Sequence, residues 1–417
     1  MIAKYPPMGW NSWDCYGAAV TEEQVLKNAA YMAEHLKPFG WEYIVVDIQW
    51  ASPAAVNHEY KPFADLEMDG YGRLMPALNR FPSAAGGRGF QPLADEIHRL
   101  GLKFGIHIMR GLPRMAAHRH LPIEGSGSRC DEAADPNSIC AWNPDMYGLR
   151  QGTEAAQDYY DSIFRLYALW GVDYVKCDDI AREYPHCRQE IEMISRACRK
   201  CGRDIVLSLS PGPAPLEQAE HLKKWANLWR ITDDFWDEWR LLKGMFERAE
   251  KWCVHAGPGH WPDADMLPLG AVRQCEGPDS WTKFTQAEQR TMMSLWCMLR
   301  SPLMIGGEMT KNDEFTLSLL TNGDLLAIEK ESWCAHPLWT TEDESVWLAP
   351  RRDGSGFWLA LFNLSEEDRM ISVSSCELER EGPLDAMELW SGAEIKSAEG
   401  ISARIAPHDA AVFYVRK

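Results

Sequence analysis

The chain has 417 residues, with 61 acidic side chains, 43 basic side chains and a formal net charge of −18. This length accommodates a barrel domain of about 250 residues or more together with one small module, and the negative charge repels phosphate backbones, so nucleic-acid binding is not expected. No run approaches the roughly 18 apolar residues of a membrane span, and the first residues lack the pattern of a secretion signal, so we expect a cytoplasmic protein without membrane association.

Helical and strand-like segments alternate from the start of the chain. Thr21 and Gln24 have the spacing of a capping box, and apolar side chains follow at helical intervals until Pro38 and Gly40 end the helix. Residues 41–50 are rich in β-branched side chains, which is typical of a strand buried on both faces. This order indicates βα units around a parallel sheet.

The same alternation continues towards residue 307. Helices are expected at about 92–100 and 153–170, because each pattern ends near a glycine. The eight expected strands lie within residues 8–13, 41–50, 102–109, 172–179, 204–210, 226–232, 251–257 and 301–307. Eight strands separated by helices favour a closed (β/α)₈ TIM barrel over an open doubly wound sheet. No G-x-G-x-x-G segment follows a strand into a helix, so no dinucleotide cofactor is expected.

The last quarter of the chain has a different pattern. Its segments are short, alternate polar with apolar residues and are separated by Gly, Asp, Ser and Glu. We therefore expect a barrel domain over residues 1–325 and a small antiparallel β module over residues 326–417. Such a module most often covers one flank of a barrel, and a carbohydrate-binding role is the alternative.

Polar side chains are expected at the carboxyl ends of the barrel strands, where catalytic groups of such barrels lie. They are Trp13, Asp14, Asp47, His107, Arg110, Lys176, Asp178, Asp179, Ser208, Ser210, Arg230, Asp233, Asp234, His260, Trp261, Asp263 and Asp265. Carboxylates, cations and indoles together suit a sugar, whose hydroxyls take the polar groups and whose C–H face takes the rings. The same cations compete with a metal ion, and the CxxC pair at Cys198 and Cys201 lacks a second pair, so no metal is expected.

Glycoside hydrolysis needs two carboxyl groups. Lys176 stands two residues before Asp178 on one strand, so both side chains share a face, and the ammonium group favours an ionised nucleophile. Asp234 lies four residues after Arg230 in a segment rich in aromatic residues, and partial desolvation there would raise its pKa towards that of a proton donor. The two carboxyl groups are then expected at about 5–5.5 Å, the separation of retaining enzymes. The neighbouring Asp179 and Asp233 remain alternatives.

Five segments resemble glycoside hydrolase family 27, the family of α-galactosidases and α-N-acetylgalactosaminidases. They are PPMGWNSWDCYG (6–17), DYVKCD (173–178), WRITDD (229–234), GPGHWPDADML (257–267) and SPLMIGG (301–307), in the family's order and over almost the whole length. The resemblance implies a TIM barrel followed by an antiparallel β-sandwich domain, a retaining mechanism and no metal. It also implies Asp178 as nucleophile, Asp234 as acid/base, and a sugar-binding role for Trp13, Asp47, Lys176, Arg230 and Asp265.

The chain departs from the family at one position that bears on specificity. Family α-galactosidases carry two adjacent aspartates after the second strand, and here Ile48 replaces the second. An apolar branched side chain cannot accept bonds from O4 and the C6 hydroxyl of galactose, and it occupies space near C6. β-L-Arabinopyranose has the same ring stereochemistry without C6, and family members known as β-L-arabinopyranosidases alter this same aspartate. The sequence therefore predicts terminal β-L-arabinopyranosides as substrates.

Further departures leave alternatives open. His107 stands where galactosidases commonly have a tyrosine, and Ser210 stands where a glutamate would bind the 2-hydroxyl. Small residues at Ser210 also make room for an N-acetyl group, so α-N-acetylgalactosaminidase and α-galactosidase activities remain alternatives, and Ile48 as a change without effect on specificity is another. Gln49 and Ile180 replace a disulfide expected near the nucleophile, in agreement with a reducing compartment.

Two other classes of protein are weighed against a glycosidase. One is a barrel that binds sugars without turnover, and the other is a metal-dependent hydrolase or isomerase. The presence of both Asp178 and Asp234 speaks against a binding-only barrel, because binding does not require that pair. The expected partner is a small carbohydrate, a terminal β-L-arabinopyranoside or α-galactoside, and the sequence leaves open whether identical chains associate.

Overall fold

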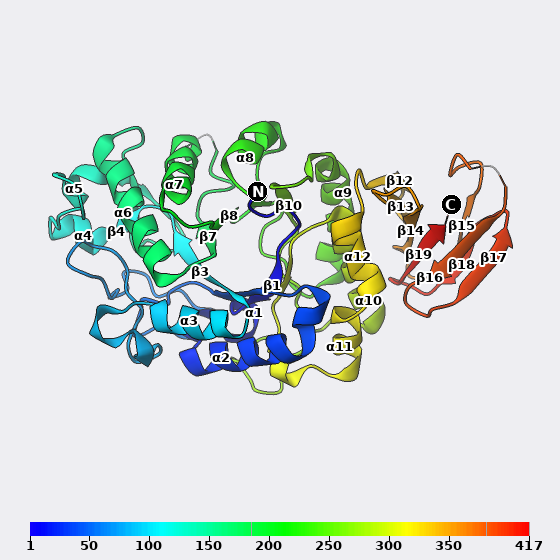
Figure 1. Ribbon diagram of the computed structural model, residues 1–417, viewed down its shortest axis with the longest axis horizontal. Helices are drawn as coiled ribbons and strands as arrows, with labels where there is room; N and C mark the ends of the chain where they lie inside the picture. The colour runs from blue at the N-terminus through cyan, green and yellow to red at the C-terminus, as the bar shows by residue number, and fades with distance from the viewer. Residues whose placement is uncertain (185, 381, 417) are drawn as a thin grey trace.

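Eight parallel strands form the central sheet of the N-terminal body. Seven of them, from β1 to β10, belong to the part of the chain coloured blue to green in Figure 1, and the eighth, β11, follows α10 in the sequence. The structure is a computed structural model and describes residues 1–184, 186–380 and 382–416. The strands are β1 (Met8–Asn11), β2 (Tyr43–Val46), β3 (Lys103–Met109), β7 (Tyr174–Asp178), β8 (Val206–Leu209), β9 (Leu228–Arg230), β10 (Trp261–Asp263) and β11 (Leu303–Ile305). They are hydrogen-bonded in the order β10-β9-β8-β7-β3-β2-β1-β11, each pair in parallel.

The ring closes through the segment that follows β10. Leu267 forms a parallel bridge with Ile305 of β11. Its backbone N–H donates to the carbonyl of Met304 over 2.8 Å, and its carbonyl accepts from the N–H of Gly306 over 2.9 Å. The predicted (β/α)₈ TIM barrel is confirmed.

Helices follow the strands and cover the outside of the barrel. The main ones are α2 (Glu22–Tyr31), α3 (Gln91–Arg99), α6 (Glu154–Trp170), α7 (Arg188–Lys200), α8 (Ala219–Trp225), α9 (Trp239–Trp252), α10 (Gln286–Leu299), α11 (Glu314–Leu320) and α12 (Gly323–Glu331). The predicted capping box begins α2, since Thr21 accepts from the N–H of Gln24 and the Gln24 side chain accepts from that of Thr21. Within the described ranges, none of the helices has the length and apolar character needed to cross a membrane.

One predicted strand is wrong. Residues 251–257 are the end of α9 and a short 3-10 turn, Cys253–His255, and the seventh strand is β10 at Trp261–Asp263. The apolar run has buried residues because α9 packs one face onto the barrel, and a short buried helix end and a buried strand share the same hydrophobic pattern.

A long excursion separates β3 from α6. It contains α4 (Arg114–His118), α5 (Cys130–Ala133) and a small antiparallel sheet of β4 (Leu112–Pro113), β6 (Met146–Leu149) and β5 (Ala134–Ile139) in that order. The loop between β2 and α3 is also long, and its Ala64 N–H donates to Asp145, which precedes β6, over 2.9 Å. These two segments therefore meet above the carboxyl ends of the strands.

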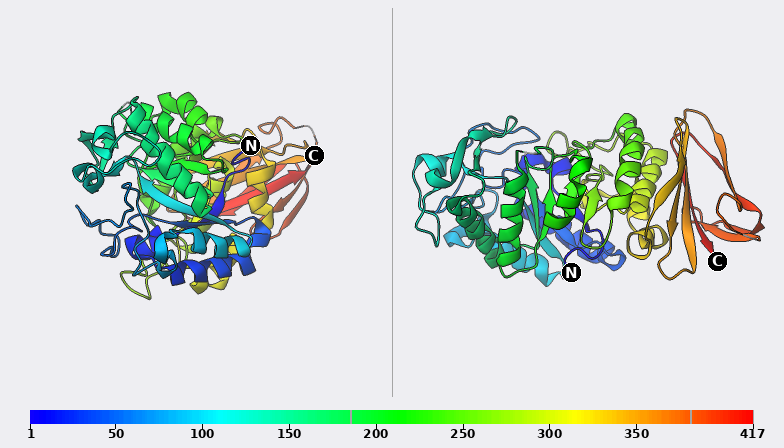
Figure 2. Two further views of the ribbon diagram at one scale, coloured as in Figure 1. Left: turned by 60° about the vertical axis from the view of Figure 1, so that its left-hand side comes forward. Right: turned by 90° about the horizontal axis from the view of Figure 1, so that it is seen from above.

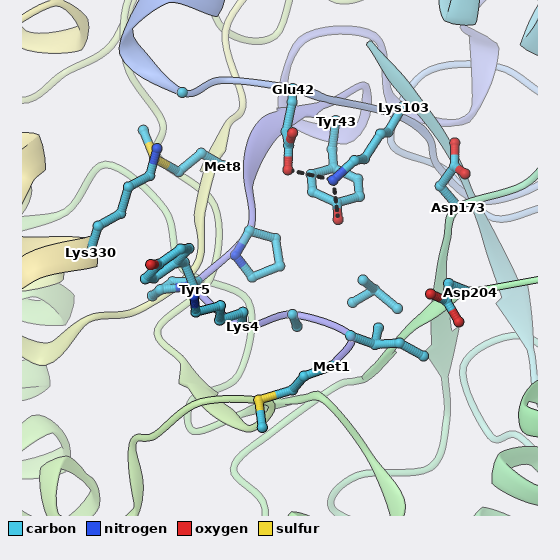
Figure 3. A pocket seen from close by; sticks show the side chains of 16 residues that line it. Met1, Lys4, Tyr5, Met8, Glu42, Tyr43, Lys103, Asp173, Asp204 and Lys330 are labelled. Atoms are coloured by element: carbon cyan, nitrogen blue, oxygen red, sulfur yellow. Dashed lines mark hydrogen bonds and ion pairs between the residues drawn. The ribbon is translucent and has the colours of Figure 1, made fainter. Parts of the chain in front are cut away.

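The amino ends of the strands surround a polar cavity of about 510 Å³ (Figure 3). Lys103, the first residue of β3, donates to Glu42 over 2.7 Å and to the hydroxyl of Tyr43 over 3.3 Å, which ties the start of β3 to that of β2. In barrels of this kind the amino end supports the framework and the chemistry lies at the other end.

The C-terminal module consists of two antiparallel sheets. The larger contains β12 (His336–Thr340), β13 (Glu344–Pro350), β14 (Gly356–Asn363), β19 (Ala410–Arg416), β16 (Leu384–Glu388) and β17 (Glu394–Ala398) in that order, and β15 (Arg369–Ser374) pairs with β18 (Gly400–Ile405). This confirms the predicted antiparallel β-sandwich. The predicted domain boundary at residue 325 falls within α12 and stays a prediction.

Strand β14 joins the module to the barrel. All of its residues are buried, and they alternate between two cores. Trp358, Ala360 and Phe362 belong to the hydrophobic cluster of the barrel, and the residues between them pack inside the sandwich. The ring of Phe362 lies edge-on to Phe246 of α9, with 5.0 Å between centroids. The sheet accordingly stands against the barrel helices in the view from above (Figure 2, right).

Polar contacts complete this interface. Arg290 of α10 forms two hydrogen bonds with Asp409, at 2.9 and 2.5 Å. The ring of the adjacent His408 stacks on Trp239 at the start of α9, with 3.8 Å between centroids. The module is therefore attached to the barrel by apolar packing and by paired charges.

The Phe362→Ala substitution tests this attachment. It removes a fully buried ring and is expected to lower the free energy of unfolding by about 3–5 kcal/mol. The control Met370→Ala, on an exposed side chain of β15, is expected to change it by no more than about 0.5 kcal/mol. Urea unfolding followed by tryptophan fluorescence measures both, and equal effects of the two substitutions would contradict the shared core.

Candidate active site

The predicted site residues all lie in the carboxyl-terminal halves of the barrel strands or just beyond them. They are Trp13, Asp47, Ile48, His107, Lys176, Asp178, Ser210, Arg230, Asp234 and Asp265. The parallel strands bring these residues to one end of the barrel.

Asp47 and Lys176 form a buried ion pair across the end of β3, which lies between β2 and β7 in the ring. The Lys176 ammonium group donates to Asp47 Oδ2 over 2.9 Å, and the Asn11 amide donates to the same oxygen over 2.7 Å. Burial raises the pKa of Asp47, but the charges of Lys176 and His107, together with the hydrogen bonds from Lys176 and the Ile48 N–H, outweigh it and hold that pKa below its usual value. Burial lowers the pKa of Lys176, and the charges of Asp47 and Asp178 reverse this, so both groups are charged.

Asp178 ends β7 and is held by hydrogen bonds on both oxygens. His107 Nε2 lies 3.0 Å from Oδ2, and the Asp179 backbone N–H donates to Oδ1 over 3.0 Å. Burial raises the pKa of Asp178, but the hydrogen bond and charge of His107 and the charge of Lys176 offset this, so the pKa lies well below its usual value. Asp178 is therefore an ionised carboxylate, as the sequence predicts for a nucleophile.

One nitrogen of Arg230 contacts two carboxyl groups. Arg230 Nη2 lies 2.7 Å from Asp265 Oδ2 and 3.1 Å from Asp234 Oδ1. Burial raises the pKa of Asp265 to about 7, against the attraction of Arg230 and with the help of the Asp234 charge. The Phe235 backbone N–H also donates to Asp265, over 2.8 Å, which ties the segment that carries Asp234 to Asp265.

The predicted desolvation of Asp234 is wrong. Its side chain is 50% exposed, whereas that of Asp178 is 13% exposed. The Phe235 ring, which follows it directly in the sequence, packs into the core against Trp296 and leaves the carboxyl group uncovered. Aromatic neighbours in the sequence therefore did not predict how exposed the Asp234 side chain is.

The Asp47–Lys176 pair and the carboxyl groups around Arg230 belong to one electrostatic cluster. The pKa of Arg230 is raised by the charges of Asp265, Asp234 and Asp178, after burial lowers it. Lys176 in turn senses Asp265 as well as Asp47. The expected 5–5.5 Å separation of the Asp178 and Asp234 carboxyl groups stays a prediction.

The two alternative carboxylates have other contacts. Asp179 is buried and forms an ion pair with Arg110 over 2.9 Å. Asp233 is exposed and pairs with Arg182 over 2.9 Å. Neither Asp179 nor Asp233 forms an ion pair with Arg230 or Lys176. The geometry therefore favours Asp178 and Asp234 as the two carboxyl groups of the reaction.

Ile48 is 2% exposed and belongs to an apolar cluster next to Asp47. The cluster includes Trp13, Met109 and Cys140. A cavity of about 30 Å³ lies beside it and is also lined by His107. Ile48 therefore gives one wall of the site an apolar surface beside the first aspartate.

Ser210 follows β8 and is also buried. Its hydroxyl oxygen has no hydrogen-bond partner among the described residues. Its backbone carbonyl accepts from the N–H groups of Ile180 and Ala181, so it lies beside the segment that carries Asp178. Twelve free cysteines account for every cysteine of the sequence, so no disulfide flanks this segment.

The described part of the chain holds no group of three or more His, Cys, Asp or Glu side chains arranged to bind a metal ion. The clustered carboxylates are paired with Lys176, Arg230 and Arg110 instead. These three cations thus offset part of the negative charge of the carboxylates.

Two residues of the site were not predicted. Asn11 is buried and bonds to Asp47, and Tyr60, from the loop between β2 and α3, stacks on Trp13 with 5.4 Å between centroids. The position of Asn11 at the end of the first strand is a signal that points to the site. The loop position of Tyr60 carries no comparable pattern.

Comparisons with known proteins identify the family of the chain. The family model described as alpha galactosidase A matches residues 147–331, and that of the alpha galactosidase C-terminal beta sandwich domain matches residues 341–415. A GH27 β-L-arabinopyranosidase from Geobacillus stearothermophilus is 53% identical, with a TM-score of 0.96, over 100% of this chain and 97% of that one, and a variant of it was solved in complex with arabinose.

Two further relatives carry other names. A Bacillus halodurans structure whose name proposes an α-N-acetylgalactosaminidase is 50% identical, with a TM-score of 0.89, over 100% of this chain and 99% of that one. An α-galactosidase of Oryza sativa subsp. japonica is 26% identical over 99% of this chain and 85% of its own length. The chain therefore belongs to glycoside hydrolase family 27, the α-galactosidase family, and is a glycoside hydrolase.

Proposed function

We propose that the enzyme is a retaining exo-glycosidase that hydrolyses terminal β-L-arabinopyranosides. The observation that carries this proposal is the buried Ile48 beside Asp47, in a site that otherwise holds paired carboxylates and cations. Such a wall is suited to a sugar that ends at C5.

The geometry supports a double displacement with Asp178 as nucleophile. Its ionised carboxylate attacks the anomeric carbon while Asp234 donates a proton to the glycosidic oxygen, and the leaving group departs. Water then enters, Asp234 takes its proton, and the resulting attack on the anomeric carbon breaks the glycosyl ester and releases Asp178. The half-exposed position of Asp234 suits a group that meets a leaving group and then water.

The remaining charged groups are suited to hold the sugar. Asp47 and Lys176 offer an acceptor and a donor at one side of the site, and Arg230 with Asp265 offers the same at the other. Trp13 supplies an apolar face next to Ile48. Sugar hydroxyls both donate and accept, so they can bond to each of these pairs.

The choice of pentose over hexose rests on Ile48 and on one relative. Galactose carries a hydroxymethyl group at C6, and a buried isoleucine cannot accept its hydrogen bond. The Geobacillus stearothermophilus protein named as a β-L-arabinopyranosidase is 53% identical to this chain. Both lines support the same sugar.

An α-N-acetylgalactosaminidase is the second candidate. The buried Ser210 hydroxyl without a partner among the described residues is a small polar group that could face a substituent at C2. Ile48 opposes this candidate, because N-acetylgalactosamine also carries the C6 hydroxymethyl group.

We further propose a cytoplasmic location, supported by twelve free thiols, which suit a reducing compartment.

Exchange of Ile48 tests the specificity. Ile48→Asp supplies the missing acceptor and is expected to raise the ratio of kcat/KM for aryl α-D-galactopyranoside to that for aryl β-L-arabinopyranoside by roughly tenfold to a hundredfold, the equivalent of about 1–3 kcal/mol. Ile48→Val, which stays apolar, is the control and should change the ratio little. The proposal fails if the Asp variant gains no galactosidase activity relative to arabinopyranosidase activity, and the aryl α-N-acetylgalactosaminide tests the second candidate in the same assay.

The two catalytic aspartates are separated by their kinetics. Asp178→Asn is expected to lower kcat/KM on every substrate to less than about a thousandth, because no other group can form the glycosyl ester. Asp234→Asn should lose roughly 10²- to 10⁴-fold on alkyl glycosides and much less on aryl glycosides whose leaving group needs no proton. Equal losses on both substrate types in the Asp234 variant would argue against an acid role.

His107 sets the acidic limit of activity. Its hydrogen bond helps to keep the pKa of Asp178 low, so Asp178 stays ionised as pH falls, and this advantage is lost below that pKa. In His107→Phe the Asp178 pKa rises, and the acidic limb of the kcat/KM profile should move to higher pH by about one unit. His107→Gln keeps a donor and should move it less. An unchanged acidic limb in the Phe variant would contradict this role.

A further inference from the structure

We propose that three partly buried rings, Tyr60, Trp142 and Trp236, form a binding site for the leaving group and select leaving groups that contain a ring with an apolar face. We call these residues the aromatic wall. The inference rests on the proposed retaining glycosidase and concerns the part of the substrate beyond the hydrolysed bond.

His58 anchors the loop that carries Tyr60. Its ring lies edge-on to Trp13, with 5.0 Å between centroids, and edge-on to Trp236, with 5.5 Å. Its Nε2 lies 2.8 Å from the Trp13 carbonyl oxygen, and its Nδ1 lies 2.7 Å from Glu276 Oε1. The loop therefore spans the distance between the end of β1 and the segment after β9.

Tyr60 lies on the catalytic side of this loop. Its ring is parallel to that of Trp13, with an angle of 5° between planes, and Trp142 packs against it with 5.0 Å between centroids. Burial raises the pKa of Tyr60, and the charges of Asp234 and Asp178 raise it further, that of Asp234 more strongly. The phenol thus lies within electrostatic range of both carboxylates, and contacts with the rings of Trp13 and Trp142 fix its ring beside the site.

The wall flanks the exposed side of the site. Asp234 is half exposed, and Trp236 follows it by two residues on the same segment. The sugar-facing groups Trp13 and Asp47 are buried, whereas all three rings of the wall are only partly buried and so present surface to a ligand. A general acid meets the leaving group, so rings next to Asp234 contact what departs.

The chemistry of the wall selects rings over chains. Aromatic faces pack against flat apolar surfaces, either another aromatic ring or the C–H face of a sugar. A short alkyl leaving group cannot cover these faces. The expected difference in kcat/KM between substrates with a ring and substrates with a short alkyl leaving group corresponds to one or two contacts between rings.

Benzyl and ethyl glycosides test the wall, because the two alcohols have similar acidity and differ in the ring. The wild type should show a kcat/KM for the benzyl glycoside roughly five- to tenfold above that for the ethyl glycoside. Trp142→Ala and Tyr60→Ala should reduce this ratio to about twofold or less, and Tyr60→Phe should preserve it. Trp333→Ala, at an exposed tryptophan outside the wall, is the control and should keep the full ratio.

The outcomes separate the two proposals. A wild-type ratio near one, or variants that lower both substrates equally, would overturn the aromatic wall while leaving the glycosidase intact. Absence of turnover on all glycosides would instead overturn the proposed function. Measuring the ratio with both β-L-arabinopyranosides and α-D-galactopyranosides keeps it independent of the sugar preference.

A disaccharide identifies the source of the ring. If kcat/KM for β-L-arabinopyranosyl-glucose falls in Trp142→Ala as it does for the benzyl glycoside, the wall accepts sugar rings. If it falls only for the benzyl glycoside, the wall serves aryl leaving groups. Either result supports a leaving-group site.

Discussion

The active site depends on one constraint, which is that the buried carboxyl groups of Asp47, Asp178 and Asp265 each lie beside the charge of Lys176 or Arg230. Asp47 is paired with Lys176 and Asp265 with Arg230, and Asp178 lies within reach of Lys176 and in hydrogen-bond contact with His107. A buried ion without a partner would cost several kcal/mol and would be neutralised by a shifted pKa. These charges let Asp178 remain an anion although its side chain is only 13% exposed, and anionic character is what nucleophilic attack on the anomeric carbon requires.

The barrel meets this constraint by placing short polar segments at the ends of neighbouring strands. The two members of each pair come from different strands, so the fold, not the local sequence, brings them together. The loops that follow the strands then contribute the apolar side chains of the site. Ile48 and Trp13 line the inner site, and the loop with His58 and Tyr60 reaches across the opening towards Trp236. In the function we propose, the charged groups serve the common chemistry, and the apolar groups distinguish one glycoside from another.

The sequence predicted most of this framework, and its failures have physical causes. A long β-branched run, a capping box and an i, i+2 spacing of Lys176 and Asp178 are local signals, and all three were reliable. Residues 251–257 were misassigned because a buried helix end has the pattern of a strand. The exposure of Asp234 and the stacking of Tyr60 on Trp13 depend on how a loop folds back in space, and no periodicity in the sequence encodes such contacts.

The closure of the ring has a consequence for how the enzyme responds to stress. The last link between β10 and β11 is the bridge of Leu267, only two residues beyond Asp265. Asp265 holds Arg230, and Arg230 holds Asp234. The closing seam of the barrel therefore runs beside the groups that hold Asp234. A displacement of Leu267 would therefore reach Asp234 through Asp265 and Arg230.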